Sequence, residues 1–113
     1  LIIMTDTPNN ENPKLSKDIE AFYKRADAII ELANSQLGSE AHSGQVGASL
    51  LYAAARYSAS VASIGFVKGS DLAKEKNEII EFYAKQYRQM LSDNLDDYAD
   101  NFDKYVQTGS EQK

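Results

Sequence analysis

The sequence predicts a small all-α protein built as a helical bundle. Three observations favour this fold class. Apolar side chains recur every three or four residues over three long segments, as they do on one face of an α-helix. Neither proline nor glycine interrupts residues 72–105. The 113 residues, 42% of them hydrophobic, suffice for one domain with one core. The specific prediction is a three-helix antiparallel bundle with an overlong third helix; the alternative is a four-helix bundle broken near Ser92.

The two ends of the chain are expected to lie outside the bundle. Pro8, Pro13 and the polar residues between them show no helical period, so residues 1–15 are interpreted as a flexible N-terminal tail. The bundle domain is assigned to residues 16–106. Residues 107–113 are then a flexible C-terminal tail.

The first helix is expected to begin at Ser16 or Asp18, because either side chain can cap free backbone N–H groups. Its apolar residues step by three or four and form one narrow stripe. They are Ile19, Phe22, Tyr23, Ala26, Ile29, Ile30, Ala33 and Leu37. Gly38 can end this helix by adopting a left-handed conformation.

The second helix is expected from about Gly44 to Ile64. Arg56 is its only charged residue, and a helix with so few charges is usually covered on more than one side. We therefore predict that it lies at the centre of the bundle. Its large apolar stripe consists of Val46, Leu50, Ala53, Tyr57, Val61 and Ile64.

The third helical segment is expected from Asp71 to Tyr105, with Ser70 as its N-cap. It is longer than the two helices against which it would pack. One continuous helix would span roughly 50 Å, against roughly 30 Å for each of the others. Its apolar pattern also changes phase by one residue after Met90. The first series is Ile80, Tyr83, Tyr87 and Met90, and the second is Leu91, Leu95, Tyr98, Phe102 and Tyr105. The two halves therefore face different partners, or the helix breaks at Ser92–Asn94, where weak helix formers stand.

Composition excludes several classes of protein. A net charge of −5 repels phosphate backbones, so we expect no nucleic-acid binding. The absence of cysteine removes disulfides, thiol nucleophiles and cysteine-ligated zinc. No apolar run approaches the ~20 residues that a membrane span needs, and Leu1–Met4 is too short for a signal-peptide core. We therefore expect a cytoplasmic protein that does not bind membranes.

No catalytic, cofactor or metal motif is present. His42 is the only histidine, and without a Glu-x-x-His or His-x-x-x-His pair it does not indicate a metal site. A serine hydrolase is not indicated either, because there is no Gly-x-Ser-x-Gly motif and His42 is the only candidate base. We expect His42 to be an exposed loop residue near a helix start. The aspartates between Asp93 and Asp103 are expected to form a solvated helix face or a dock for a basic partner. The sequence thus favours a binding protein over an enzyme, with no catalytic, cofactor or metal residue assigned.

Two surfaces are candidates for binding. The second apolar series (Leu91, Leu95, Tyr98, Phe102, Tyr105) has the spacing of a helix-helix seam and is rich in interface residues, so it predicts a homodimer or a protein partner. The alternative is that this segment folds back and is simply core. Arg56, one turn after Tyr52, could bind a small ligand or anion, or form an ion pair with an acidic side chain of a neighbouring helix.

Two stretches of the chain resemble a proteobacterial family of small uncharacterised helical proteins, a domain-of-unknown-function family. They are Leu50-Leu51-Tyr52-Ala53-Ala54-Ala55-Arg56-Tyr57 and Asn94-Leu95-Asp96-Asp97-Tyr98, the latter followed by Asn101-Phe102-Asp103-Lys104-Tyr105. The resemblance covers about residues 20–106. It implies a bacterial origin and a helical fold, and it brings no activity, ligand or catalytic residue.

Overall fold

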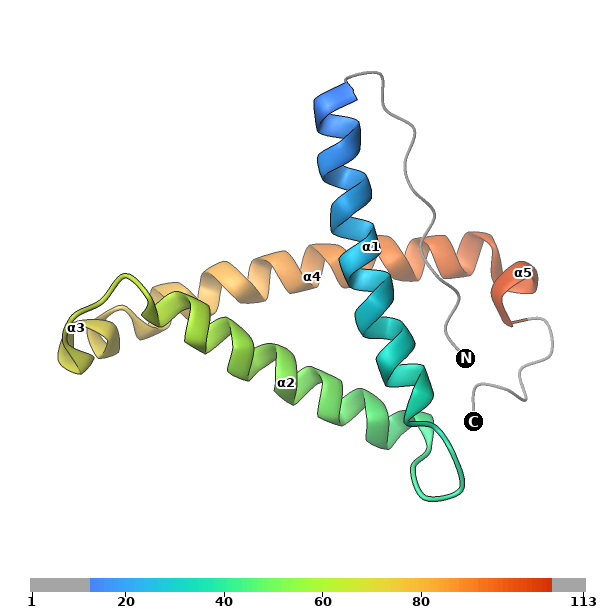
Figure 1. Cartoon of the computed structure of the whole chain (residues 1–113), viewed down its shortest axis with the longest axis horizontal. Coiled ribbons are helices and arrows are strands. Elements are labelled where there is room, and N and C mark those ends of the chain that lie inside the picture. Colours follow the sequence, from blue (N-terminus) through green and yellow to red (C-terminus); the bar gives the residue numbers. More distant parts are fainter. Residues whose placement is uncertain (1–12, 107–113) are drawn as a thin grey trace. The chain divides into compact units, whose positions relative to one another are not determined.

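The computed structural model describes residues 13–106, and over this range the chain is helical without any strand, which confirms the all-α prediction (Figure 1). Five helices follow one another. They are α1 (Pro13–Ser35), α2 (Ser43–Ser63), α3 (Gly69–Lys74), α4 (Lys76–Asp100) and α5 (Phe102–Val106). The expected C-terminal tail lies outside the described residues, as does the expected N-terminal tail up to residue 12.

Helix α1 begins at Pro13, three residues before the expected cap at Ser16. Proline suits the first position of a helix, because its missing N–H would have no intrahelical acceptor there. The helix ends at Ser35, and Gly38 does not adopt the left-handed conformation that we predicted. Its N–H instead donates to the Ala41 carbonyl at 3.0 Å and closes a tight loop before α2.

The apolar stripe of α1 divides into two rows. One row is half-buried and steps by four and three: Ile19, Tyr23, Ala26, Ile30, Ala33 and Leu37. Phe22 and Ile29, which were expected on the same stripe, are about half exposed. They lie in a second row with Leu15, at steps of seven. The stripe is therefore wider than one packing contact covers.

Helix α2 has the predicted bounds to within one residue. It carries Val46, the only buried side chain among the described residues. Tyr57 and Ile64, which belong to the same predicted stripe, are largely exposed. The expected central position of this helix is therefore not confirmed by the structure and stays a prediction.

Helices α3 and α4 are separated by Glu75 alone. The first turn of α3 is closed by the Lys68 carbonyl, which accepts the N–H groups of Asp71 at 3.1 Å and Leu72 at 3.3 Å. The cap is thus Lys68 and not Ser70, whereas Asp71 does lie in the first turn, where its charge suits the helix dipole. Like-charged Glu78 raises the pKa of Glu75, first through a side-chain hydrogen bond and then through charge repulsion.

Helix α4 runs without interruption through Ser92–Asn94, so the predicted break near Ser92, and with it that form of the four-helix alternative, is wrong. Side-chain hydrogen bonds one turn apart keep this stretch helical. Gln89 Nε2 donates to Asp93 Oδ1 at 2.9 Å, and Asn94 Nδ2 donates to the Met90 carbonyl at 2.7 Å. Asp93 and Asn94, which could have capped a new helix, are engaged with the preceding turn instead.

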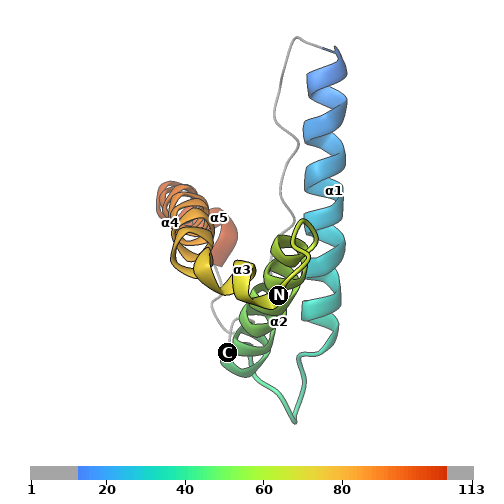
Figure 2. The ribbon, with the colours of Figure 1, turned by 90° about the vertical axis from the view of Figure 1, so that its left-hand side faces the viewer.

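The break in the third segment falls at Asn101. Its backbone (φ −119°, ψ 34°) leaves the helical region, while its N–H still donates to the Asp97 carbonyl at 3.0 Å. Helix α5 then departs from the axis of α4 (Figure 2). The overlong third helix is therefore three helices, of which α4 accounts for 25 residues.

The chain divides into two compact units, between Leu50 and Leu51. In the first unit, Val46 and the half-buried row of α1 provide the covered apolar surface. In the second, one group of half-buried apolar side chains lies where α2, α3 and α4 follow one another, and Tyr98, Tyr105 and Val106 form another at the end of α4 and in α5. The first group consists of Ala62, Phe66, Leu72, Ile79 and Tyr83. The three-helix antiparallel bundle is not confirmed by this structure and stays a prediction.

Candidate interaction surface

Helix α4 carries two distinct apolar faces. At about 100° per residue, Ile79, Tyr83 and Met90 fall within about 40° of one another. Ile79 and Tyr83 are half-buried within the second unit. A second row lies about 100° away on average and is exposed along its whole length. We call this row the α4 outer face, and it consists of Ile80, Ala84, Tyr87, Leu91 and Leu95.

The outer face contains residues from both of the apolar series that were predicted to lie on different faces of the helix. Ile80 and Tyr87 were assigned to a different face from Leu91 and Leu95. On an uninterrupted helix, steps of four, three, four and four residues place all of them, together with Ala84, within about 80°. The alanine was missed because it is small, and counting only large apolar residues concealed the continuous row.

A polar edge borders the outer face on one side. Arg88, Ser92 and Asp96 are spaced four residues apart on one ridge of the helix, which turns away from the row by about 40° at each step, so Arg88 lies nearest to the row and Asp96 farthest from it. Together with the part of the outer face from Ala84 to Leu95, they line one shallow, open depression along the helix. Arg88 and Asp96 were not identified from the sequence. Each directly follows an apolar residue of the row, Tyr87 or Leu95, and this spacing could have indicated that they border it.

The predicted seam from Leu91 to Tyr105 is divided by the break at Asn101. Leu91 and Leu95 lie on the outer face, and Tyr98 continues the same line of α4. Phe102 and Tyr105 belong to α5, where Phe102 is exposed. The Tyr98 and Tyr105 rings contact each other with centroids 4.5 Å apart, and both residues are half-buried.

Hydrogen bonds to Asp97 hold α5 against the end of α4. The Asp97 carboxylate accepts hydrogen bonds from Asn101 Nδ2 at 2.9 Å and from the Tyr105 hydroxyl at 3.0 Å. Partial burial, and secondly the charge of Asp97, raise the pKa of the Tyr98 phenol. Part of the expected seam thus packs locally against the end of α4.

Two aspartates of the acidic run lie on the side of α4 away from the outer face. Asp93 and Asp100 lie within about 20° of each other and nearly opposite the apolar row, at about 100° per residue. All the aspartates from Asp93 to Asp103 are exposed. This placement fits the expected solvated face.

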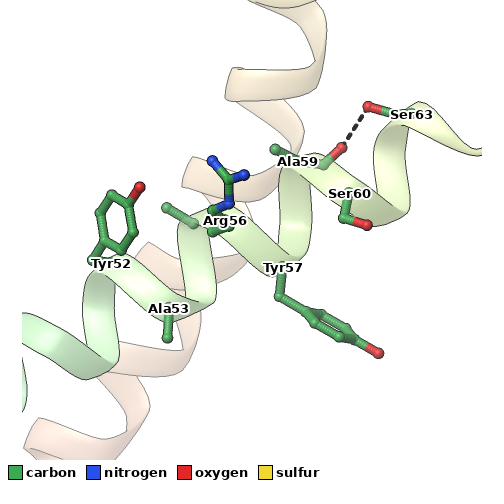
Figure 3. Close-up of a pocket in the computed structure, with 8 residues that line it drawn as sticks. Tyr52, Ala53, Arg56, Tyr57, Ala59, Ser60 and Ser63 are labelled. Atoms are coloured by element: carbon green, nitrogen blue, oxygen red, sulfur yellow. Dashed lines mark hydrogen bonds between the residues drawn. The ribbon is translucent and has the colours of Figure 1, made fainter.

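Arg56 and Tyr52 lie one turn apart on the same side of α2, whereas Tyr57 points away (Figure 3). Both line a shallow depression formed by this helix alone, with Ser60 and Ser63 further along it. Arg56 makes no hydrogen bond or ion pair with any residue in the described range. An acidic partner for Arg56 stays a prediction.

His42 lies immediately before α2 and is exposed, as expected. The His42 ring Nδ1 accepts the Gly44 backbone N–H at 3.1 Å. The His42 backbone N–H donates to Gln45 Oε1 at 3.0 Å. The imidazole therefore serves as the N-cap of α2, a structural role. A Cβ at position 44 would stand 3.1 Å from the ring, so glycine there gives the ring room.

The described residues contain a further depression but neither a metal-binding group nor a membrane-spanning helix. A further apolar depression in the second unit, of about 300 Å³, lies between the end of α2 and the α3–α4 corner, with Lys76 among its lining residues. Within residues 13–106, no group of three His, Asp or Glu side chains is placed to hold a metal ion. No helix in this range is both long and apolar enough to cross a membrane.

Comparison with known proteins gives one match. No curated protein and no solved structure matches the chain. A family described as "Protein of unknown function (DUF3144)" matches residues 22–99, which span most of α1, all of α2 and α3, and α4 almost to its end. This chain belongs to the DUF3144 family.

Proposed function

We propose that the protein is a small interaction module that acts as a homodimer through the α4 outer face. The observation that supports this most is the row itself. Its large side chains, Ile80, Tyr87, Leu91 and Leu95, are each at least two-fifths exposed on one straight helix. Monomeric proteins rarely present large contiguous apolar surfaces to water, and such surfaces mark sites of association.

The proposal needs no cofactor and no catalytic residue. We place the protein in a bacterium, as the family resemblance implies, and in its cytoplasm, a reducing compartment that a sequence without cysteine suits. A further protein partner would bind the face that the homodimer leaves open, and the exposed aspartates of α4 favour a basic one.

Leu95→Glu is expected to convert the dimer into a folded monomer, because it places a charge on the associating surface. The measurement is light-scattering mass at tens of micromolar, with far-ultraviolet circular dichroism to confirm that the helices persist. Phe82→Glu is the matched control. Phe82 is 57% exposed against 59% for Leu95, and it lies on a different side of α4. A wild-type protein of monomeric mass would refute the proposal, as would equal dissociation by both variants.

The second candidate is a site for small anions at Arg56 and Tyr52. It is favoured by the guanidinium that has no partner in the described range and by the phenol beside it (Figure 3). Guanidinium groups bind phosphate and carboxylate oxygens in two-point geometry.

Titration calorimetry with inorganic phosphate tests this site. We expect Arg56→Met to abolish the binding and Arg88→Met, at an exposed arginine elsewhere, to retain it. An absence of phosphate binding in the wild type, or the same isotherm for both variants, would exclude the anion site.

A further inference from the structure

We infer that the second copy lies antiparallel along the α4 outer face, with a two-fold axis beside Ser92, so that Arg88 of each copy meets Asp96 of the other. This inference rests on the proposed homodimer and adds its orientation and register. It follows from three features of α4: an exposed apolar row, a polar edge of opposite charges, and the spacing between them.

The polar edge is self-complementary. Arg88 and Asp96 stand four residues before and after Ser92, so each lies about one turn from it, roughly 6 Å along the axis. A two-fold axis perpendicular to the helix at Ser92 exchanges these two levels. It therefore brings each guanidinium opposite a carboxylate, twice in the same interface, as an isologous dimer requires.

The two charges have no competing partner within the chain that the structure describes. They are about 12 Å apart on their own helix, beyond the one-turn spacing at which helical ion pairs form. Neither makes an ion pair or hydrogen bond with another described residue. Both line the same open depression as Leu91 and Leu95.

A parallel pair of α4 helices would bring like charges together instead of opposite charges. It would set Arg88 beside Arg88 and Asp96 beside Asp96, and like charges facing each other oppose association. The antiparallel pair surrounds its axis with Leu91 and Leu95 from both copies and brings Tyr87 to the level of Tyr98 of the second copy. The apolar row and the charge pattern thus select the same orientation.

Engineered single cysteines test the orientation, because the wild-type chain has none to interfere. A disulfide needs Cα atoms within about 7 Å of each other. In the antiparallel register the two copies of position 92 lie at the same level on either side of the two-fold axis, while the two copies of position 84 lie roughly 24 Å apart along the helices. We expect Ser92→Cys to form a disulfide-linked dimer in the full-length protein under mild oxidation and Ala84→Cys to remain unlinked.

Charge exchange tests the register independently. Arg88→Asp and Asp96→Arg each create two like-charged contacts, and each is expected to weaken self-association about tenfold. Mixing the two variants restores opposite charges in the mixed dimer, so the equimolar mixture is expected to associate as the wild type does. The measurement is sedimentation equilibrium of each variant and of the mixture.

The outcomes separate the two proposals. A monomeric wild type, in which the outer face is covered by the chain's own first helix or by nothing, refutes the homodimer and this inference together. A dimer in which Ala84→Cys links as readily as Ser92→Cys is parallel, and it refutes the inference alone. So does a dimer in which neither variant links or the charge variants show no complementation.

Discussion

Asp93→Pro is expected to cost about 3 kcal/mol or more of unfolding free energy, because position 93 lies in the middle of an unbroken helix. Proline there removes one backbone hydrogen bond and sets its ring against the carbonyl of Gln89. It also disfavours the helical conformation of Ser92. Had α4 ended near Ser92, position 93 would lie in a new first turn, where proline is well accommodated. Urea unfolding followed by circular dichroism measures the difference.

Two further variants make this result specific. Asp93→Ala removes the carboxylate that accepts from Gln89 Nε2 but leaves the backbone intact, so it isolates the side-chain contribution. Gly69→Pro places proline at the first residue of α3, after Lys68 in an extended conformation (φ −119°, ψ 138°) that suits a residue before proline. A Cβ at position 69 would meet no atom within 4 Å. We expect Gly69→Pro to be neutral or to stabilise by up to about 1 kcal/mol. Similar stability for Asp93→Pro and Asp93→Ala would contradict a continuous α4.

The helical class and the limits of α2 could be predicted because they depend on local signals. Apolar period identifies a helix, and the polar connection before Ser43 and the glycine after Ile64 bound it. The half-buried row of α1 was likewise contained in the predicted stripe. The pattern could not tell which of two overlapping rows is covered, because that depends on packing partners distant in sequence.

The position of the break in the third segment could not be predicted from propensity. Ser92, Asp93 and Asn94 each cost about 0.5 kcal/mol in a helix relative to alanine. This small penalty is offset by hydrogen bonds to the preceding turn, of which Asn94 Nδ2 to the Met90 carbonyl is one. Asn101 is also a weak helix former, yet the chain turns there. The contact between Tyr98 and Tyr105 and the hydroxyl bond to Asp97 accompany that turn. These contacts depend on the turned geometry, which the spacing of a straight helix does not reveal.

The candidate surface was predicted in part. Leu91 and Leu95 were identified because they are large and regularly spaced, and the structure places them in an exposed row. Tyr105 was assigned to the same seam by extending the period across Asn101, where the helix does not continue. The charges that give the surface an orientation, Arg88 and Asp96, become informative only once α4 is known to be continuous.

Val46→Asp is expected to unfold the first unit or to cost at least about 3 kcal/mol, because it places an unpaired carboxylate in a buried site. Val46 is 7% exposed and is the one buried side chain that the structure shows in residues 15–106. A small protein has few such positions, so the loss of one removes a large share of a small margin of stability.

Val67→Asp is the matched control, since Val67 is 98% exposed and the same substitution there creates no buried charge. Its stability is expected to stay within about 0.5 kcal/mol of the wild type.

The pH dependence of stability distinguishes a buried carboxylate from a general packing defect. Burial raises the pKa of an introduced carboxyl in the folded state, so its neutral form is favoured there. The deficit of Val46→Asp relative to Val67→Asp should therefore shrink as the pH falls toward the pKa of an unfolded aspartate and grow as the pH rises. Urea unfolding of both variants across that pH range measures it, and equal stability of the two at neutral pH would show that position 46 is open to water in solution.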